Sequence, residues 1–188
     1  MPDTHHLYHC HERGQPPFRT LTSLPMEEAK VNARKILADM SESFISGFLQ
    51  RRYERDQMLR GAFLAIGGKP VRSAPVYFTL GPNEGMKTWF DDPVQVKIPV
   101  SAFDPDTVSF TYGDSFAVFN PALDTGEEWW GRVYRYDEIL RLIDARGFPE
   151  DPPYHMRKRV FPEGRPINHI LKFVEAHVWS DEVLERYR

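Results

Sequence analysis

The chain has 188 residues, a formal net charge of −3 and one cysteine, Cys10. This length is typical of one domain with its own hydrophobic core, so we expect residues 1–188 to form a single domain. The weak negative charge provides no global field that would attract nucleic acid, so nucleic-acid binding would require a local basic patch. A polar N-terminus, the lack of a long apolar run and the single cysteine together predict a cytoplasmic protein with no membrane span and no internal disulfide.

Clusters of β-branched and aromatic residues, some of them alternating with polar residues, predict strands. In chain order the expected strands cover residues 7–11, 75–80, 94–100, 108–119, 132–134 and 170–179. Gly113, Asp114 and Ser115 interrupt the fourth segment and predict a hairpin turn there, which the aromatic neighbours should bury in part. The strands indicate a mixed or antiparallel central sheet, either in one piece or split into two.

Apolar residues at helical spacing predict long helices over residues 26–40 and 42–66 and a short helix over 138–146. Together with the strands, these helices indicate the α+β class. The periodicity of the second helix places Arg52 and Arg55 on or beside its buried stripe. Either their stems cover the core while their heads pair with carboxylates, or one of them faces a cleft and binds a phosphate.

Side chains that can bind zinc gather near the N-terminus, at His5, His6, His9, Cys10 and His11. Their spacing lacks the paired pattern of known zinc motifs, so we predict no metal site and expect histidines that are exposed or hydrogen-bonded within a strand. Trp129 and Trp130 lie on an acidic loop. There they either stack on a planar ligand or close the edge of the core.

Glu175 lies within the last predicted strand, and the alternation of that strand places it on one face with Phe173, His177 and Trp179. A carboxylate among such neighbours is either paired in the interior or lines a cleft, where it can take part in chemistry. Glu175 is therefore a candidate site residue, with both interpretations open.

A histidine on the first strand, a tyrosine on a central strand and a glutamate on the last strand resemble the His, Tyr, Glu signature of the ADP-ribosyltransferase fold. That fold uses two small sheets to form a split cleft for NAD. The similarity is to the DNA-targeting ADP-ribosyltransferase toxins and is carried by Leu7-Tyr8-His9-Cys10-His11, Pro75-Val76-Tyr77-Phe78-Thr79 and Phe173-Val174-Glu175-Ala176-His177-Val178. His11 stands where those toxins have threonine, and no arginine follows the Tyr77 motif, so Arg51, Arg52 or Arg55 would have to substitute.

The resemblance implies a role for each matched residue. His9 would contact a ribose of NAD, Tyr77 would pack on the nicotinamide, and Glu175 would hold a ribose hydroxyl and stabilise an oxocarbenium-like transition state. Arg52 and Arg55 are the further NAD-binding candidates. NAD is then a substrate, no metal is needed, and the acceptor of ADP-ribose stays open between protein, nucleic acid, a small molecule and water.

A second hypothesis is a non-enzymatic α+β domain that binds a protein or a small ligand. Under this hypothesis the loop of Trp129 and Trp130 forms the binding surface. Glu175 is then a structural ion-pair partner of Arg52, Arg55 or Lys172. The two hypotheses are distinguished by whether His9, Tyr77 and Glu175 line one cavity.

Overall fold

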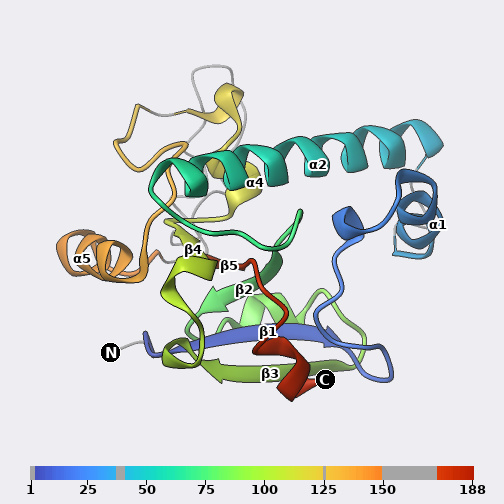
Figure 1. The fold of residues 1–188 in the computed structure, drawn as a ribbon. Coiled ribbons are helices and arrows are strands. Elements are labelled where there is room, and N and C mark those ends of the chain that lie inside the picture. Colours follow the sequence, from blue (N-terminus) through green and yellow to red (C-terminus); the bar gives the residue numbers. More distant parts are fainter. Residues whose placement is uncertain (1–2, 37–40, 125, 150–172) are drawn as a thin grey trace, which may run out of the picture.

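The computed structural model describes residues 3–36, 41–124, 126–149 and 173–188 (Figure 1). The strands are β1 (His6–Glu12), β2 (Val76–Leu80), β3 (Pro93–Pro99), β4 (Val108–Thr111) and β5 (Val174–Val178). The helices are α1 (Met26–Ile36), α2 (Glu42–Ala65), α3 (Glu84–Lys87), α4 (Ser115–Val118) and α5 (Tyr136–Arg146). The predicted α+β class is confirmed.

The strands form one antiparallel sheet in the order β3-β1-β2-β5-β4. β1 pairs with β3 along its whole length, from His6 opposite Pro99 to Glu12 opposite Pro93. Its pairing with β2 is limited to Leu7 opposite Leu80 and Tyr8 opposite Thr79. The sheet is therefore continuous, but a narrow link joins its β3-β1 part to its β2-β5-β4 part.

The pairing register separates the side chains of the sheet into two faces, because successive strand residues point to opposite sides. The apolar face is formed by Leu7, His9, Val76, Phe78, Leu80, Ile98, Val108, Phe110, Val174, Ala176 and Val178. The polar face is formed in its β2-β5-β4 part by Tyr77, Thr79, Ser109, Thr111, Glu175 and His177. α2 covers the polar face, since its Asp56 accepts a hydrogen bond from the Tyr77 hydroxyl. α5 packs on the apolar face, where the rings of Phe110 and Tyr136 lie 5.7 Å apart.

α2 is the long helix that Figure 1 shows above the sheet, with α1 beside its N-terminal end. Its start is capped by Ser41, whose hydroxyl accepts a hydrogen bond from the Phe44 backbone N–H. Its end follows from Gly67, which takes a positive φ of 81°, and from Gly68, where a Cβ atom would lie 2.5 Å from the Phe63 ring. The predicted end of this helix at the glycine pair is confirmed.

The predicted strand over residues 108–119 is correct only in its first part. β4 ends at Thr111, and residues 115–118 form α4 instead of the second arm of a hairpin. The Asp114 carboxylate accepts a hydrogen bond from the Phe116 N–H and starts a helical turn, which the apolar pattern alone did not reveal. The segment is buried as predicted, while residues 132–134 contribute only an isolated bridge between Phe110 and Tyr134.

The remaining predicted elements differ at their ends. α1 is described as far as Ile36, and part of the predicted helix over residues 26–40 lies outside the described residues. The same holds for residues 170–172 of the last predicted strand. α5 begins two residues before its predicted start, with Arg135 in place of Asp137 as its N-terminal flanking residue.

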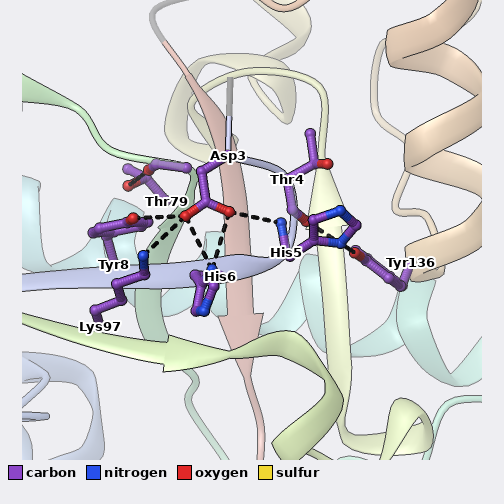
Figure 2. Close-up of polar contacts among 9 residues, drawn as sticks. Asp3, Thr4, His5, His6, Tyr8, Thr79, Lys97 and Tyr136 are labelled. Atoms are coloured by element: carbon purple, nitrogen blue, oxygen red, sulfur yellow. Dashed lines mark hydrogen bonds and ion pairs between the residues drawn. The ribbon is translucent and has the colours of Figure 1, made fainter. Parts of the chain in front are cut away.

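The Asp3 carboxylate holds the start of β1 in place, as Figure 2 shows. It lies 3.0 Å from the His6 Nδ1 atom, accepts a hydrogen bond of 2.8 Å from the Tyr8 hydroxyl, and forms an ion pair of 3.2 Å with Lys97 of β3. The backbone N–H of His5 donates to it as well. Burial alone would raise the pKa of Asp3, but these donors outweigh burial and hold the pKa well below its ordinary value.

We expect Asp3→Ala to lower the free energy of unfolding by about 1 to 2 kcal/mol, because several donors lose a charged acceptor at once. A carboxyl whose pKa is depressed in the folded state stabilises it above the unfolded pKa, here 3.8. The difference from wild type should therefore be full at neutral pH and shrink as the pH falls below about 4. Urea unfolding at several pH values measures it, with exposed Asp91→Ala as the control; equal losses in both variants would contradict the role of Asp3.

Candidate functional site

The candidate site is a layer of polar side chains enclosed between the polar face of the sheet and α2. Buried polar side chains on a covered sheet face are unusual, since each requires a hydrogen-bond partner. Thr79, Ser109, Thr111 and His177 are each at most 4% exposed, and Glu175 is 7% exposed. The layer contains three residues that the sequence singled out, namely Arg52, Tyr77 and Glu175.

Asp56 joins α2 to the sheet at this layer. Its carboxylate is 2% exposed and accepts hydrogen bonds from the hydroxyls of Tyr77 and Thr22. Burial raises the pKa of Asp56, while the charge of Arg52 and the two hydroxyl donors act against that rise. Since α2 presents Arg52 and Asp56 one turn apart, the two side chains reach the same layer. Asp56 was not among the predicted site residues, although its spacing of four from Arg52 on the predicted helix was a usable signal.

Arg52 lies on the ring of Tyr77. Its guanidinium carbon is 4.5 Å from the Tyr77 ring centroid and 5.8 Å from that of Phe116. Burial alone would lower the pKa of Arg52, but the nearby Tyr77, Asp56 and Glu175 raise it, so the guanidinium stays charged. A planar cation thus rests on an aromatic face with two carboxylates in its surroundings.

Glu175 is held by two donors. Its Oε2 atom accepts a hydrogen bond of 2.9 Å from the Ser115 backbone N–H, and it lies 3.1 Å from Nε2 of His177. Burial by itself would raise the pKa of Glu175, but the contact with His177, the Ser115 donor and the charge of Arg52 lower it below the ordinary value. The carboxylate is therefore ionised and oriented.

Next to Glu175, the buried Oγ atom of Ser115 has no hydrogen-bond partner among the described residues. Buried hydroxyls nearly always have one, so this atom has an unused capacity to bind a polar group. Neither Ser115 nor His177 was singled out from the sequence. His177 was detectable, because it follows Glu175 by two residues on a strand, whereas Ser115 reaches the layer only through the fold.

His9 lies apart from this layer. It is in phase with Leu7 on the apolar face, and its ring packs 5.1 Å from that of Phe18 and 5.2 Å from that of Phe78. The Phe18 backbone N–H donates to Nε2 of His9 over 3.1 Å, so Nδ1 carries the proton and donates to the Tyr77 carbonyl oxygen over 2.9 Å. The structure thus brings Tyr77 and Glu175 together on the polar face, whereas His9 lies on the opposite face of the sheet and bonds the Tyr77 backbone. The three residues therefore do not line one cavity.

The pKa of His9 predicts a measurable pH dependence. Burial lowers this pKa from 6.5 to about 4, so the neutral ring is favoured in the folded state. A histidine with a depressed pKa supports stability fully above the unfolded pKa, and that support is lost as the pH falls from about 6.5 towards 4. Urea unfolding between these values should show a loss approaching 1 kcal/mol per pH unit in wild type relative to His9→Gln. If the free energy of unfolding changed with pH in the same way in both proteins, the lowered pKa of His9 would be contradicted.

Arg55 and the tryptophan pair do not belong to the layer. Arg55 donates to the Phe119 carbonyl oxygen, and its guanidinium lies 5.8 Å from the Phe116 ring. Trp129 is 4% exposed and packs against the rings of Tyr112 and Trp130. The pair therefore closes the edge of the core, and the aromatic ligand surface considered for this loop is not formed by Trp129. Lys172, the third partner considered for Glu175, lies outside the described residues.

Two surface hollows lie elsewhere on the molecule. One of about 460 Å³ is lined by residues including Arg60, Leu64 and Val71, and one of about 390 Å³ is lined by residues including His5, Phe110 and Tyr136. Neither is lined by Tyr77 or Glu175. In the described ranges no group of three or more His, Cys, Asp or Glu side chains is arranged to hold a metal ion.

No helix in the described part of the chain is both long enough and apolar enough to cross a membrane. Comparison with known proteins gives no match to a protein-family model, to a curated protein or to a solved structure.

Proposed function

We propose that the protein binds NAD at the polar layer and cleaves the bond between nicotinamide and ribose, as an ADP-ribosyltransferase or an NAD glycohydrolase. The observation that carries this proposal is the convergence of Arg52, Tyr77 and Glu175 from three separate segments on one face of the sheet. These residues supply an aromatic face that binds a planar cation and an oriented carboxylate, which are the two features that the reaction requires.

The contact of Arg52 with Tyr77 indicates the kind of group that this ring accepts. The nicotinamide ring of NAD is also planar and positively charged, so the electron-rich face of Tyr77 attracts it for the same reason. Since the guanidinium now occupies that face at 4.5 Å, nicotinamide binding requires Arg52 to move aside. Its charge then becomes available to the pyrophosphate of NAD.

Glu175 provides the electrostatic part of the reaction. Loss of nicotinamide develops positive charge on the ribose, so an ionised carboxylate stabilises the transition state more than the ground state. The lowered pKa of Glu175 keeps it in the charged form at neutral pH. The Ser115 hydroxyl beside it, which has no partner in the described part of the chain, offers a hydrogen-bond partner to a ribose hydroxyl.

Two of the predicted roles receive different support. The bonds of His9 favour a role in holding the Tyr77 backbone, and the predicted contact of His9 with ribose stays a prediction. Arg52 is the better candidate for NAD binding, because Arg55 already donates to the Phe119 carbonyl oxygen outside the layer. The acceptor of ADP-ribose stays open between protein, nucleic acid, a small molecule and water.

The proposal is tested by comparing Tyr77→Leu with Tyr77→Phe. The leucine variant removes the aromatic face, so its affinity for NAD should fall about tenfold, which corresponds to ~1.4 kcal/mol. The phenylalanine variant keeps the ring and should bind NAD within about threefold of wild type, although it melts earlier because Asp56 loses a donor. Titration calorimetry with NAD and chromatographic detection of released nicotinamide give both readings.

Wild-type protein that neither binds NAD nor releases nicotinamide would reject the proposed function outright. Equal NAD affinity in the leucine and phenylalanine variants would reject the role of the Tyr77 ring alone. Melting curves of both variants are needed, since an unfolded variant would lose binding for an unrelated reason.

A further inference from the structure

We propose that His177 is a positioning residue for Glu175, acting through a hydrogen-bonded chain that runs from Trp179 through Ser109 and His177 to the carboxylate. The inference rests on the proposed function and adds to it a residue that does not itself touch NAD. Ser109 lies on β4, His177 and Glu175 lie on the neighbouring strand β5, and Trp179 directly follows β5.

The distances define the chain. Nε1 of Trp179 donates to Oγ of Ser109 over 2.9 Å, and Oγ of Ser109 lies 3.3 Å from Nδ1 of His177. Nε2 of His177 lies 3.1 Å from Oε2 of Glu175. Trp179, Ser109 and His177 are each 0% exposed, so water does not replace any of these bonds in the folded protein.

The chemistry of the two ends determines where the protons lie. An indole nitrogen only donates, so Ser109 accepts from Trp179 and its own hydroxyl proton is free to point at His177. An ionised carboxylate only accepts, so Nε2 of His177 must carry a proton and donate to Glu175. A neutral His177 then accepts a hydrogen bond at Nδ1 from Ser109 and donates one at Nε2 to Glu175. Each polar atom in this series of hydrogen bonds therefore has a partner.

This arrangement limits the rotation of the Glu175 carboxylate. Oε2 receives both the His177 donor and the Ser115 backbone N–H, so the other oxygen is turned in a constant direction. A carboxylate that stabilises charge on a ribose is effective only when it is oriented before the reaction. His177 is itself oriented by the Tyr77 ring, which meets its ring edge at a centroid distance of 5.6 Å.

Other charged or titratable groups also face this part of the layer. Arg52 and Asp56 face it from α2, Tyr77 faces it from β2, and Asp114 lies at the start of α4. A change in the pH profile therefore has to be measured against wild type, with these four residues intact. Ser109→Ala is suited to this comparison, because it removes the chain's link to Nδ1 of His177 without altering any of those groups.

The experiment measures steady-state release of nicotinamide by wild type, His177→Leu, His177→Gln and Ser109→Ala. His177→Leu removes the donor, so kcat should fall about tenfold or more while KM for NAD changes by less than about threefold. His177→Gln returns an N–H donor near the same position and should recover most of kcat. Ser109→Ala should lower kcat a few-fold and shift its pH profile, because the tautomer of His177 is no longer set. Thr107→Val is the matched control, since that buried hydroxyl lies just before β4, outside the polar layer, and donates to the Asp104 carbonyl oxygen instead.

A measurement without NAD separates this inference from the proposed function. Nitrogen-15 NMR of the histidine rings should show His177 of wild type protonated at Nε2 and unprotonated at Nδ1, and Ser109→Ala should change that pattern. A wild type that does not cleave NAD overturns the proposed function and this inference with it. An active wild type whose folded His177→Leu variant keeps its kcat overturns the positioning role alone, as does a His177 protonated only at Nδ1.

Discussion

Glu175→Gln is expected to lower the rate of nicotinamide release about 100-fold or more while NAD binding persists, because the change removes the charge and keeps the size of the side chain. This corresponds to ~3 kcal/mol of transition-state stabilisation. Both bonds to Glu175 end on the same atom, Oε2, so the amide oxygen of glutamine can accept from Ser115 and His177 in its place. We therefore expect the variant to fold, with its loss confined to kcat.

The same variant distinguishes the enzyme from a structural ion pair. If Glu175 served only as a counter-charge for Arg52, its neutralisation would cost stability, up to about 3 to 5 kcal/mol for a buried pair, with no separate effect on catalysis. Melting temperature, NAD affinity and nicotinamide release are measured on wild type, Glu175→Gln and the exposed control Glu182→Gln. A Glu175→Gln protein that melts far earlier, beside a wild type without NAD activity, would favour the non-enzymatic alternative.

Asp56→Leu is expected to cause the largest loss of stability, about 3 to 5 kcal/mol, because it leaves two buried hydroxyls without their acceptor and removes one of the carboxylates near Arg52. The hydroxyls of Thr22 and Tyr77 both donate to this carboxylate, and its charge acts on Arg52 together with that of Glu175. For a chain of this length the loss corresponds to a fall of roughly 10 °C in melting temperature. Thermal unfolding followed by circular dichroism measures the change.

Glu54→Leu is the matched control for this prediction, since Glu54 lies on the exposed side of α2 and bonds only the side chain of Gln50 among the described residues. Its melting temperature should stay within about 2 °C of wild type. If Asp56→Leu melted as late as this control, the polar layer would not be the element that attaches α2 to the sheet. Asp56 would then have no role in joining α2 to the candidate site.

Local patterns were sufficient to predict most of the secondary structure. Alternation in residues 94–100 and the helical periodicity of residues 42–66 both express the burial of one face, and this burial is a property that the sequence carries directly. The pattern was insufficient at residues 115–118, where four apolar or small residues suit a strand and a helical turn equally well. There the side chain of Asp114 decides in favour of the helix by capping it.

The sequence by itself determined the α+β class and the candidate residues Arg52, Tyr77 and Glu175. Two further residues of the layer could also have been predicted but were missed. Asp56 follows Arg52 by four residues on a helix, and His177 follows Glu175 by two residues on a strand. Only the tertiary structure decided which candidates meet, because the direction of a strand residue depends on the register with its neighbours, and a shift of one residue reverses it. The pairing of Leu7 with Leu80 turns His9 to the apolar face. The pairing of Thr79 with Glu175 turns the carboxylate towards α2, so that it shares one layer with Tyr77 of β2 and Arg52 of α2.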